Sequence, residues 1–156
     1  MRHNRMLSDI RAAFLGSACL VLATGAFVSS AAAASVVSVA LTDPSAGGSI
    51  QGMRIIAAPD TVKAGTVTFH ATNGSKSHVH EMILVHQPPN GRKLPYNDKR
   101  QRVDESRIKS LGEVSELEPG KSGTLTVKLQ PGDYLLFCNQ AGHYASGMRT
   151  SFKVKR

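Results

Sequence analysis

The sequence predicts an all-β domain built as an antiparallel β-sandwich. Seven short apolar or alternating segments follow one another between residues 36 and 155, and turns that contain Gly and Pro separate several of them. No segment has a strong helical period, and the chain has no internal repeat. Many short strands joined by Gly and Pro turns are typical of a β-sandwich.

Four strands are predicted in the first part of this region. Residues 36–41 form a short β-branched run, and residues 53–58 form a second apolar run. Residues 66–72 alternate with period two, which places every second side chain on one face of a strand. Asn73-Gly74 then marks a turn, and residues 79–86 follow as the fourth strand.

Residues 87–111 are predicted to form a long loop with one helical turn, because three prolines, a glycine and most of a charged run interrupt any strand pattern. Loops of this length in compact domains are often functional or mobile, and a solvated insertion is the alternative. Strands resume afterwards. Residues 124–129 alternate polar and apolar, residues 134–138 form a dense apolar strand, and residues 150–155 close the domain.

Residues 1–34 are predicted to be a secretory signal peptide. Three arginines fall within the first 11 residues, residues 12–34 carry no charge, and Ala32-Ala33-Ala34 fits a cleavage site of small residues. An uncleaved membrane anchor is the alternative, since 23 uncharged residues could span a bilayer. Cleavage would leave residues 35–156 as one exported domain, which we expect in the periplasm.

The domain at 35–156 is basic, with 16 Lys and Arg against 10 Asp and Glu. Such a charge favours acidic partners or an anionic membrane face. The basic residues are scattered and form no run of five, so the sequence does not indicate a nucleic-acid-binding protein.

Cys138 is the only cysteine outside the predicted signal peptide, because Cys19 lies within it. A single cysteine cannot form an internal disulfide, and a bare thiol is a liability in an oxidising compartment. A metal bound to the sulfur would remove that liability. A buried inert thiol and an intermolecular disulfide are the alternatives.

Three side chains that can bind a soft metal lie close together near the end of the chain. Cys138, His143 and Met148 are spaced as C-x4-H-x4-M directly after an apolar strand. With one more histidine they would complete the trigonal His2Cys set with a weak axial Met that binds copper for electron transfer. Zinc is the rival metal, but zinc sites rarely include methionine.

The fourth ligand is expected from His80 or His78. His80 is the preferred candidate, because it lies immediately ahead of the core residues of its strand. His86 is about 20 Å further along an extended strand, at roughly 3.3 Å per residue. Alternation along the strand turns Glu81 away from His80, which argues against a carboxylate ligand.

Two motifs resemble those of the cupredoxins, the type 1 (blue) copper proteins of the plastocyanin and azurin kind. The first is His80-Glu81 followed by the apolar run at 82–85, and the second is the C-N-x-x-G-H-Y-x-x-G-M loop at 138–148. The resemblance covers most of residues 36–155 and is closest to small bacterial periplasmic members. It implies a Greek-key antiparallel β-sandwich of about seven to eight strands.

The resemblance also implies a role for each site residue. His80, Cys138 and His143 would be the equatorial ligands of one type 1 copper ion, and Met148 would be the axial ligand. The ring edge of His143 would be the electron port, inside an apolar surface patch. The expected members of that patch are Ala141, Tyr144 and Ala145.

Glu81 departs from the family pattern. In plastocyanin and azurin an Asn often occupies this position and ties the two ligand loops together. The sequence therefore does not predict which contacts support the ligands here.

The function implied is that of a one-electron carrier between redox protein partners, in a monomeric protein that is not an enzyme. No Ser/His/Asp or paired-carboxylate arrangement is evident in the sequence. A copper-binding module for copper delivery, storage or resistance is the alternative. A metal-free interaction domain is the third hypothesis.

Overall fold

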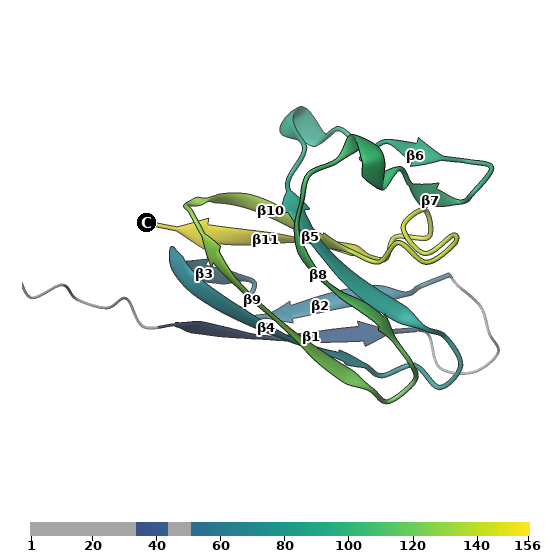
Figure 1. The fold of residues 1–156 in the computed structure, drawn as a ribbon, viewed down its shortest axis with the longest axis horizontal. Coiled ribbons are helices and arrows are strands. Elements are labelled where there is room, and N and C mark those ends of the chain that lie inside the picture. The colour runs from purple at the N-terminus through teal and green to yellow at the C-terminus, as the bar shows by residue number, and fades with distance from the viewer. Residues whose placement is uncertain (1–33, 44–50) are drawn as a thin grey trace, which may run out of the picture. The chain divides into compact units, whose positions relative to one another are not determined.

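The computed structural model describes residues 34–43 and 51–156 (Figure 1). The predicted signal peptide at 1–34 lies almost wholly outside the described residues. Within the described ranges, no helix is long and apolar enough to cross a membrane.

The first sheet has four strands in the order β2-β1-β4-β9. They are β1 (Ser35–Thr42), β2 (Arg54–Ala58), β4 (Gly65–Asn73) and β9 (Ser122–Leu129). β1 pairs with β2 in antiparallel fashion but with β4 in parallel, and β4 pairs with β9 in antiparallel fashion. Alternate residues of β4 are buried, as its period-two pattern predicts.

The second sheet has five strands in the order β3-β11-β10-β5-β8. They are β3 (Thr61–Lys63), β5 (His80–His86), β8 (Ser110–Leu117), β10 (Gly132–Phe137) and β11 (Arg149–Lys155). β10 lies between β11 and β5 and is antiparallel to both, whereas β3 is parallel to β11. The carboxyl end of β10 and the start of β11 therefore meet at one end of the sandwich.

The segment predicted as a long loop is an insertion with short elements of its own. It contains two 3-10 turns, η1 (Pro89–Gly91) and η2 (Glu105–Arg107). Between these turns, β6 (Tyr96–Asn97) and β7 (Arg102–Val103) pair as an antiparallel ribbon. The ribbon lies beside the yellow loop that joins β10 to β11 (Figure 1).

The prediction of an all-β Greek-key sandwich is confirmed, but two of its details are wrong. The sheets are mixed, because β1 and β3 each pair in parallel with a strand distant in the chain. The strands are also more numerous than seven to eight, because β3, the ribbon and β8 were not predicted. β3 and the ribbon are too short to give a periodic pattern, and β8 carries several exposed polar residues.

β5 and β10 are buried on both faces, which explains their continuous apolar sequences. Met82 and Leu84 belong to the main core between the sheets, as expected for side chains that share one face. Ile83 and Phe137 point to the opposite face and belong to a smaller apolar cluster. The insertion covers this cluster with residues that include Leu94, Val103 and Ile108.

Gly112→Ala is expected to destabilise the domain. Gly112 has a φ of 144°, and a Cβ there would lie 2.6 Å from Cδ1 of Leu125. Strain at positive φ costs about 1–3 kcal/mol, and the Leu125 side chain must shift to make room, which adds about 0.5–1.5 kcal/mol. Gly91→Ala is the control, because Gly91 also has a positive φ but no atom within 4 Å of the added Cβ. Urea unfolding should show a larger loss for Gly112→Ala; equal losses would contradict the steric argument.

Candidate metal centre

The loop between β10 and β11 brings three of the predicted ligands together through its backbone. Cys138 follows β10 directly, and Met148 immediately precedes β11. The amide of Cys138 donates a hydrogen bond to the carbonyl of Met148 (3.1 Å), and the amide of Met148 donates to the carbonyl of His143 (3.0 Å). These two bonds close the loop over residues 138–148, called the ligand loop below.

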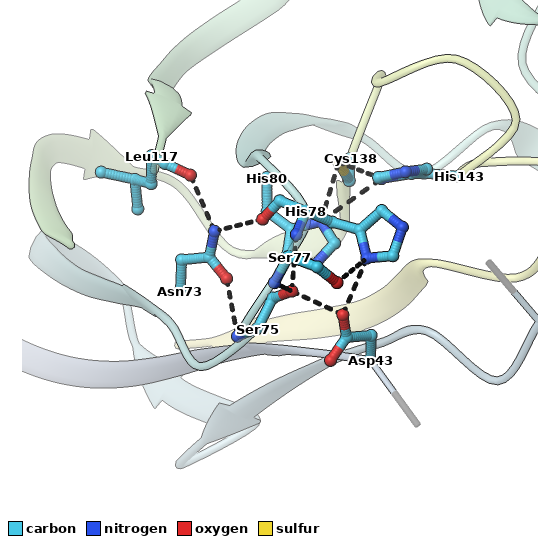
Figure 2. A network of polar contacts seen from close by, with 9 residues as sticks. All are labelled: Asp43, Asn73, Ser75, Ser77, His78, His80, Leu117, Cys138 and His143. Carbon is cyan, nitrogen blue, oxygen red and sulfur yellow. Dashed lines mark hydrogen bonds and ion pairs between the residues drawn. The ribbon is translucent and has the colours of Figure 1, made fainter. Parts of the chain in front are cut away.

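His80, Cys138 and His143 form a buried cluster whose donor atoms face one another, as Figure 2 shows. Nδ1 of His143 lies 3.3 Å from Nδ1 of His80 and 3.4 Å from Sγ of Cys138, and the sulfur lies 4.0 Å from Nδ1 of His80. Metal bonds of about 2.0 Å to nitrogen and 2.3 Å to sulfur place three such donors roughly 3.3–3.7 Å apart. The spacing therefore fits a single shared metal ion.

Met148 is fully buried and belongs to the same core cluster as Cys138. Its backbone is bonded to both Cys138 and His143, so the structure holds all four predicted residues at one end of the sandwich. A thiolate, two imidazoles and a thioether form a soft donor set that suits copper better than zinc.

Burial sets the protonation of the three facing side chains. Burial is the main reason that the pKa values of His80 and His143 fall to about 4, so both rings are neutral at pH 7 and able to coordinate. Burial also raises the pKa of the Cys138 thiol to about 11. Coordination by this sulfur therefore requires the release of its proton.

His78 lies beside the cluster but is held by other groups. Its Nδ1 lies 2.9 Å from a carboxylate oxygen of Asp43 and 3.1 Å from Oγ of Ser77. Its ring is partly exposed, and its nitrogens are not part of the cluster of facing donors. Of the two histidines considered for the fourth position, the structure thus places His80 against Cys138 and His143.

The turn that leads to His80 is fixed by a polar network that sequence reasoning did not find (Figure 2). The buried side chain of Asn73 donates to the carbonyls of His78 (2.8 Å) and Leu117 (2.7 Å), and its oxygen accepts from the amide of Ser75 (2.9 Å). The hydroxyl of Ser75 donates to Asp43, and this bond is the main reason that the pKa of Asp43 is lowered. Asn73-Gly74 could be predicted as a turn, but the bonds from Asn73 to Leu117 and from Ser75 to Asp43 join segments that are distant in the chain.

Known structures show where this fold occurs. No protein-family model and no curated protein sequence matches the chain. Auracyanin from Roseiflexus castenholzii is 22% identical with a TM-score of 0.53, over 80% of this chain and 99% of that chain. Rusticyanin from Thiobacillus ferrooxidans is 20% identical with a TM-score of 0.57, over 78% of this chain and 77% of that chain.

The domain has the cupredoxin fold. Auracyanin B matches as well, at 21% identity and a TM-score of 0.53, over 78% of this chain and 89% of that chain. The comparisons thus agree on the architecture that the sequence motifs led us to expect.

Glu81 links the two ligand-bearing segments of this cupredoxin fold. Its carboxylate is not one of the facing donors, and its Oε1 accepts a hydrogen bond from the amide of Asn139 (3.0 Å). Burial is the main reason that the pKa of Glu81 is raised to about 7. Glu81 therefore ties the strand of His80 to the residue that follows Cys138, a contact that the sequence did not predict.

Asn139 joins the ligand loop to the insertion. It is buried, and its Oδ1 accepts from the amide of Val103 (2.6 Å). Its Nδ2 donates to the carbonyl of Val103 (3.0 Å) and to a carboxylate oxygen of Glu105 (2.6 Å). The sequence analysis did not predict this contact. The available signal was the position of Asn139, a polar residue that directly follows Cys138 at the end of an apolar strand.

The prediction of which residues form an exposed patch around His143 is only partly correct. Ala141 and Ala145 are exposed, but Tyr144 is 4% exposed and packs edge-on against Phe137. The hydroxyl of Tyr144 accepts a hydrogen bond from the amide of Leu94 (3.1 Å), so this ring anchors the insertion. Assigning Tyr144 to an exposed patch was therefore wrong.

Proposed function

We propose that the domain binds one copper ion and carries single electrons between redox proteins, without being an enzyme. His80, Cys138 and His143 are the proposed equatorial ligands, and Met148 is the proposed axial ligand. The observation that supports this most directly is the buried triangle of two imidazole nitrogens and one sulfur, with separations of 3.3, 3.4 and 4.0 Å.

The choice of copper rests on the donor set and on the proteins that share the fold. Thiolate and thioether favour Cu(I), while imidazole serves both oxidation states. Rusticyanin is described as a copper protein, and the auracyanin structure is of a dithionite-reduced form. Both descriptions agree with a redox-active copper site in this fold.

The bound copper would supply a one-electron couple between Cu(II) and Cu(I). The protein contributes a site that changes little between these two states. The ligand loop is closed by backbone hydrogen bonds, and Glu81 holds it to β5. Asn73 and Ser75 hold the turn before His80, so the donors are positioned before a metal binds. His143, between exposed Ala141 and Ala145, is the proposed exit for the electron.

Voltammetry of the copper-loaded protein tests the proposed carrier role against copper delivery. A carrier gives a reversible couple and keeps its metal in the presence of a competing chelator, because its donors are buried and pre-positioned. A protein that yields its copper readily to the chelator or to an apo-partner would instead support delivery. If the protein binds no copper, the third hypothesis, a metal-free interaction domain, would be supported instead.

His80→Ala is expected to remove the type 1 spectrum and to weaken copper binding by more than about 100-fold, since the loss of an outer partner alone costs 10–100-fold. His78→Ala is the matched control, because His78 lies two residues away but is bonded to Asp43 instead. Visible absorption and competitive copper titration of both variants check the assignment. Loss of the spectrum in His78→Ala with retention in His80→Ala would reverse it.

We also propose that the protein is exported to the periplasm as a monomer after cleavage behind Ala34. The support is the charge and apolar pattern of residues 1–34, together with a β1 that begins at Ser35. Mass spectrometry of the exported protein checks the cleavage site, and a mass that retains the first 34 residues would contradict it. The redox partners are expected to be proteins with acidic surfaces.

A further inference from the structure

The insertion between β5 and β8 concentrates the positive charge of the domain. Residues 87–110 contain seven Lys and Arg against three Asp and Glu, a net charge of +4. The whole of residues 35–156 contains 16 against 10. Most of the excess positive charge therefore belongs to one segment, which makes up only a small part of the domain.

The ribbon of the insertion is fastened directly to the ligand loop. The amide of Gly142, the residue before His143, donates to the carbonyl of Gln101 (2.8 Å). Arg102 donates to the side chain of Gln140 (3.1 Å). The side chain of Asn139 is hydrogen-bonded to both the amide and the carbonyl of Val103. The cations of the ribbon are thus held at a fixed place beside the proposed electron exit.

Two hollows in the surface flank the ligand loop, and each has cations at its edge. One is lined by Lys93, Tyr96, Asp98, Tyr144, Ala145 and Arg149. In it, the guanidinium of Arg149 lies 5.0 Å from the ring centre of Tyr144, and Tyr96 stacks on Tyr144 at 6.0 Å. The other hollow is lined by Arg100 and Arg102, together with Asp104, Glu105 and Asn139. We call Lys93, Arg100, Arg102 and Arg149 the basic rim.

The cations of the basic rim form no ion pair among the described residues. Among residues 34–43 and 51–156, the one ion pair made by a Lys or Arg joins Lys153 to Asp133. The three acids of the insertion lie in the same hollows, but its seven Lys and Arg still leave it with a net charge of +4. Lys93 and Arg100 are exposed, and their side chains form no hydrogen bond among the described residues. These two cations are therefore the most available to a molecule that approaches the ligand loop.

We propose that the basic rim and the exposed part of the ligand loop form the docking surface for an acidic protein, the electron-transfer partner of the proposed copper site. The partner is expected to present clustered Asp and Glu side chains around its own redox centre. Complementary charges of this kind accelerate association and orient the encounter. The inference rests on the proposed function, because the partner is placed by the position of the electron exit.

A charge-reversal experiment with a matched control tests this surface. Lys93→Glu/Arg100→Glu reverses two exposed cations of the rim whose side chains make no hydrogen bond or ion pair within the described part of the chain. Lys63→Glu/Lys155→Glu makes the same change in net charge at the opposite end of the sandwich, where Lys63 pairs with Lys155. Circular dichroism of each variant verifies that the fold is retained.

The first readout is binding to poly-L-glutamate, which does not require copper. The rim variant is expected to bind about tenfold more weakly or worse, and the far-end variant to change by less than about threefold. NMR shifts of the wild type should map to residues 93–103 and 141–149. Equal weakening by both variants, or shifts at the far end alone, would overturn the proposed surface whatever the state of the metal site.

The second readout is electron transfer by the copper-loaded protein at a gold electrode coated with carboxylate-terminated thiols. The rim variant should lose at least about tenfold in interfacial rate at low salt, and this difference should shrink as salt screens the charges. Its visible spectrum and its potential should change little. If the copper-loaded wild type showed no copper band, the proposed function would be wrong. If the wild type and the rim variant both showed the band and had equal interfacial rates, only the docking proposal would be wrong.

Discussion

Copper-loaded Cys138→Ser should lack the intense visible absorption expected of the wild-type protein. That absorption requires a thiolate bonded to copper, and a serine hydroxyl remains protonated and is a hard donor. Binding of Cu(I) should also weaken by more than about 100-fold, since the soft thiolate is the strongest donor in the site. Absorption, paramagnetic resonance and competitive titration check these outcomes.

The fold should survive this change, because serine is close to cysteine in size and Cys138 makes no disulfide. Met148→Leu is the matched control: it removes the weak axial donor but leaves both imidazoles and the thiolate in place. This variant should keep an intense band. If Cys138→Ser kept the band, or if the wild type never showed one, the type 1 assignment would be wrong.

The features that the sequence predicted well are those with local patterns. Alternation along 66–72 and the apolar runs at 79–86 and 134–138 correspond to β4, β5 and β10. Cys138, His143 and Met148 lie in one short loop, so their proximity in space could be predicted from their proximity in the sequence. His80 could be favoured over His78 because it is adjacent to the strand, and the structure indeed places it against Cys138.

The features that were missed depend on contacts between distant segments. Asn73 is bonded to Leu117, and Ser75 is bonded to Asp43, across gaps of more than 30 residues. The parallel pairing of β3 with β11 joins segments about 90 residues apart. The three residues of β3 are too few to show a pattern that would predict this strand or its partner. β5 is buried on both faces because the insertion covers its outer face, which is again a contact between distant segments.

Asn139→Ala is expected to cost about 2–4 kcal/mol of stability and to loosen the insertion. The amide side chain of Asn139 satisfies both the N–H and the carbonyl of buried Val103, and it also donates to Glu105. Its removal leaves buried groups without partners, at about 1–3 kcal/mol each. Urea unfolding measures the loss, and limited proteolysis should show faster cleavage within 87–110.

Gln140→Ala is the control, because Gln140 is the next residue along the loop and, within the described part of the chain, its side chain accepts a single hydrogen bond, from part-buried Arg102. Its effect should stay within about 0.5 kcal/mol, as is usual for surface changes. If both variants were equally stable, the contact between Asn139 and Val103 would not hold the insertion. The position of the basic rim would then depend on the remaining attachments of the insertion to the ligand loop, which include the hydrogen bonds from Leu94 to Tyr144 and from Gly142 to Gln101. Tyr144→Phe, which removes only the accepting hydroxyl, would measure the contribution of the bond to Leu94 by the same proteolysis assay.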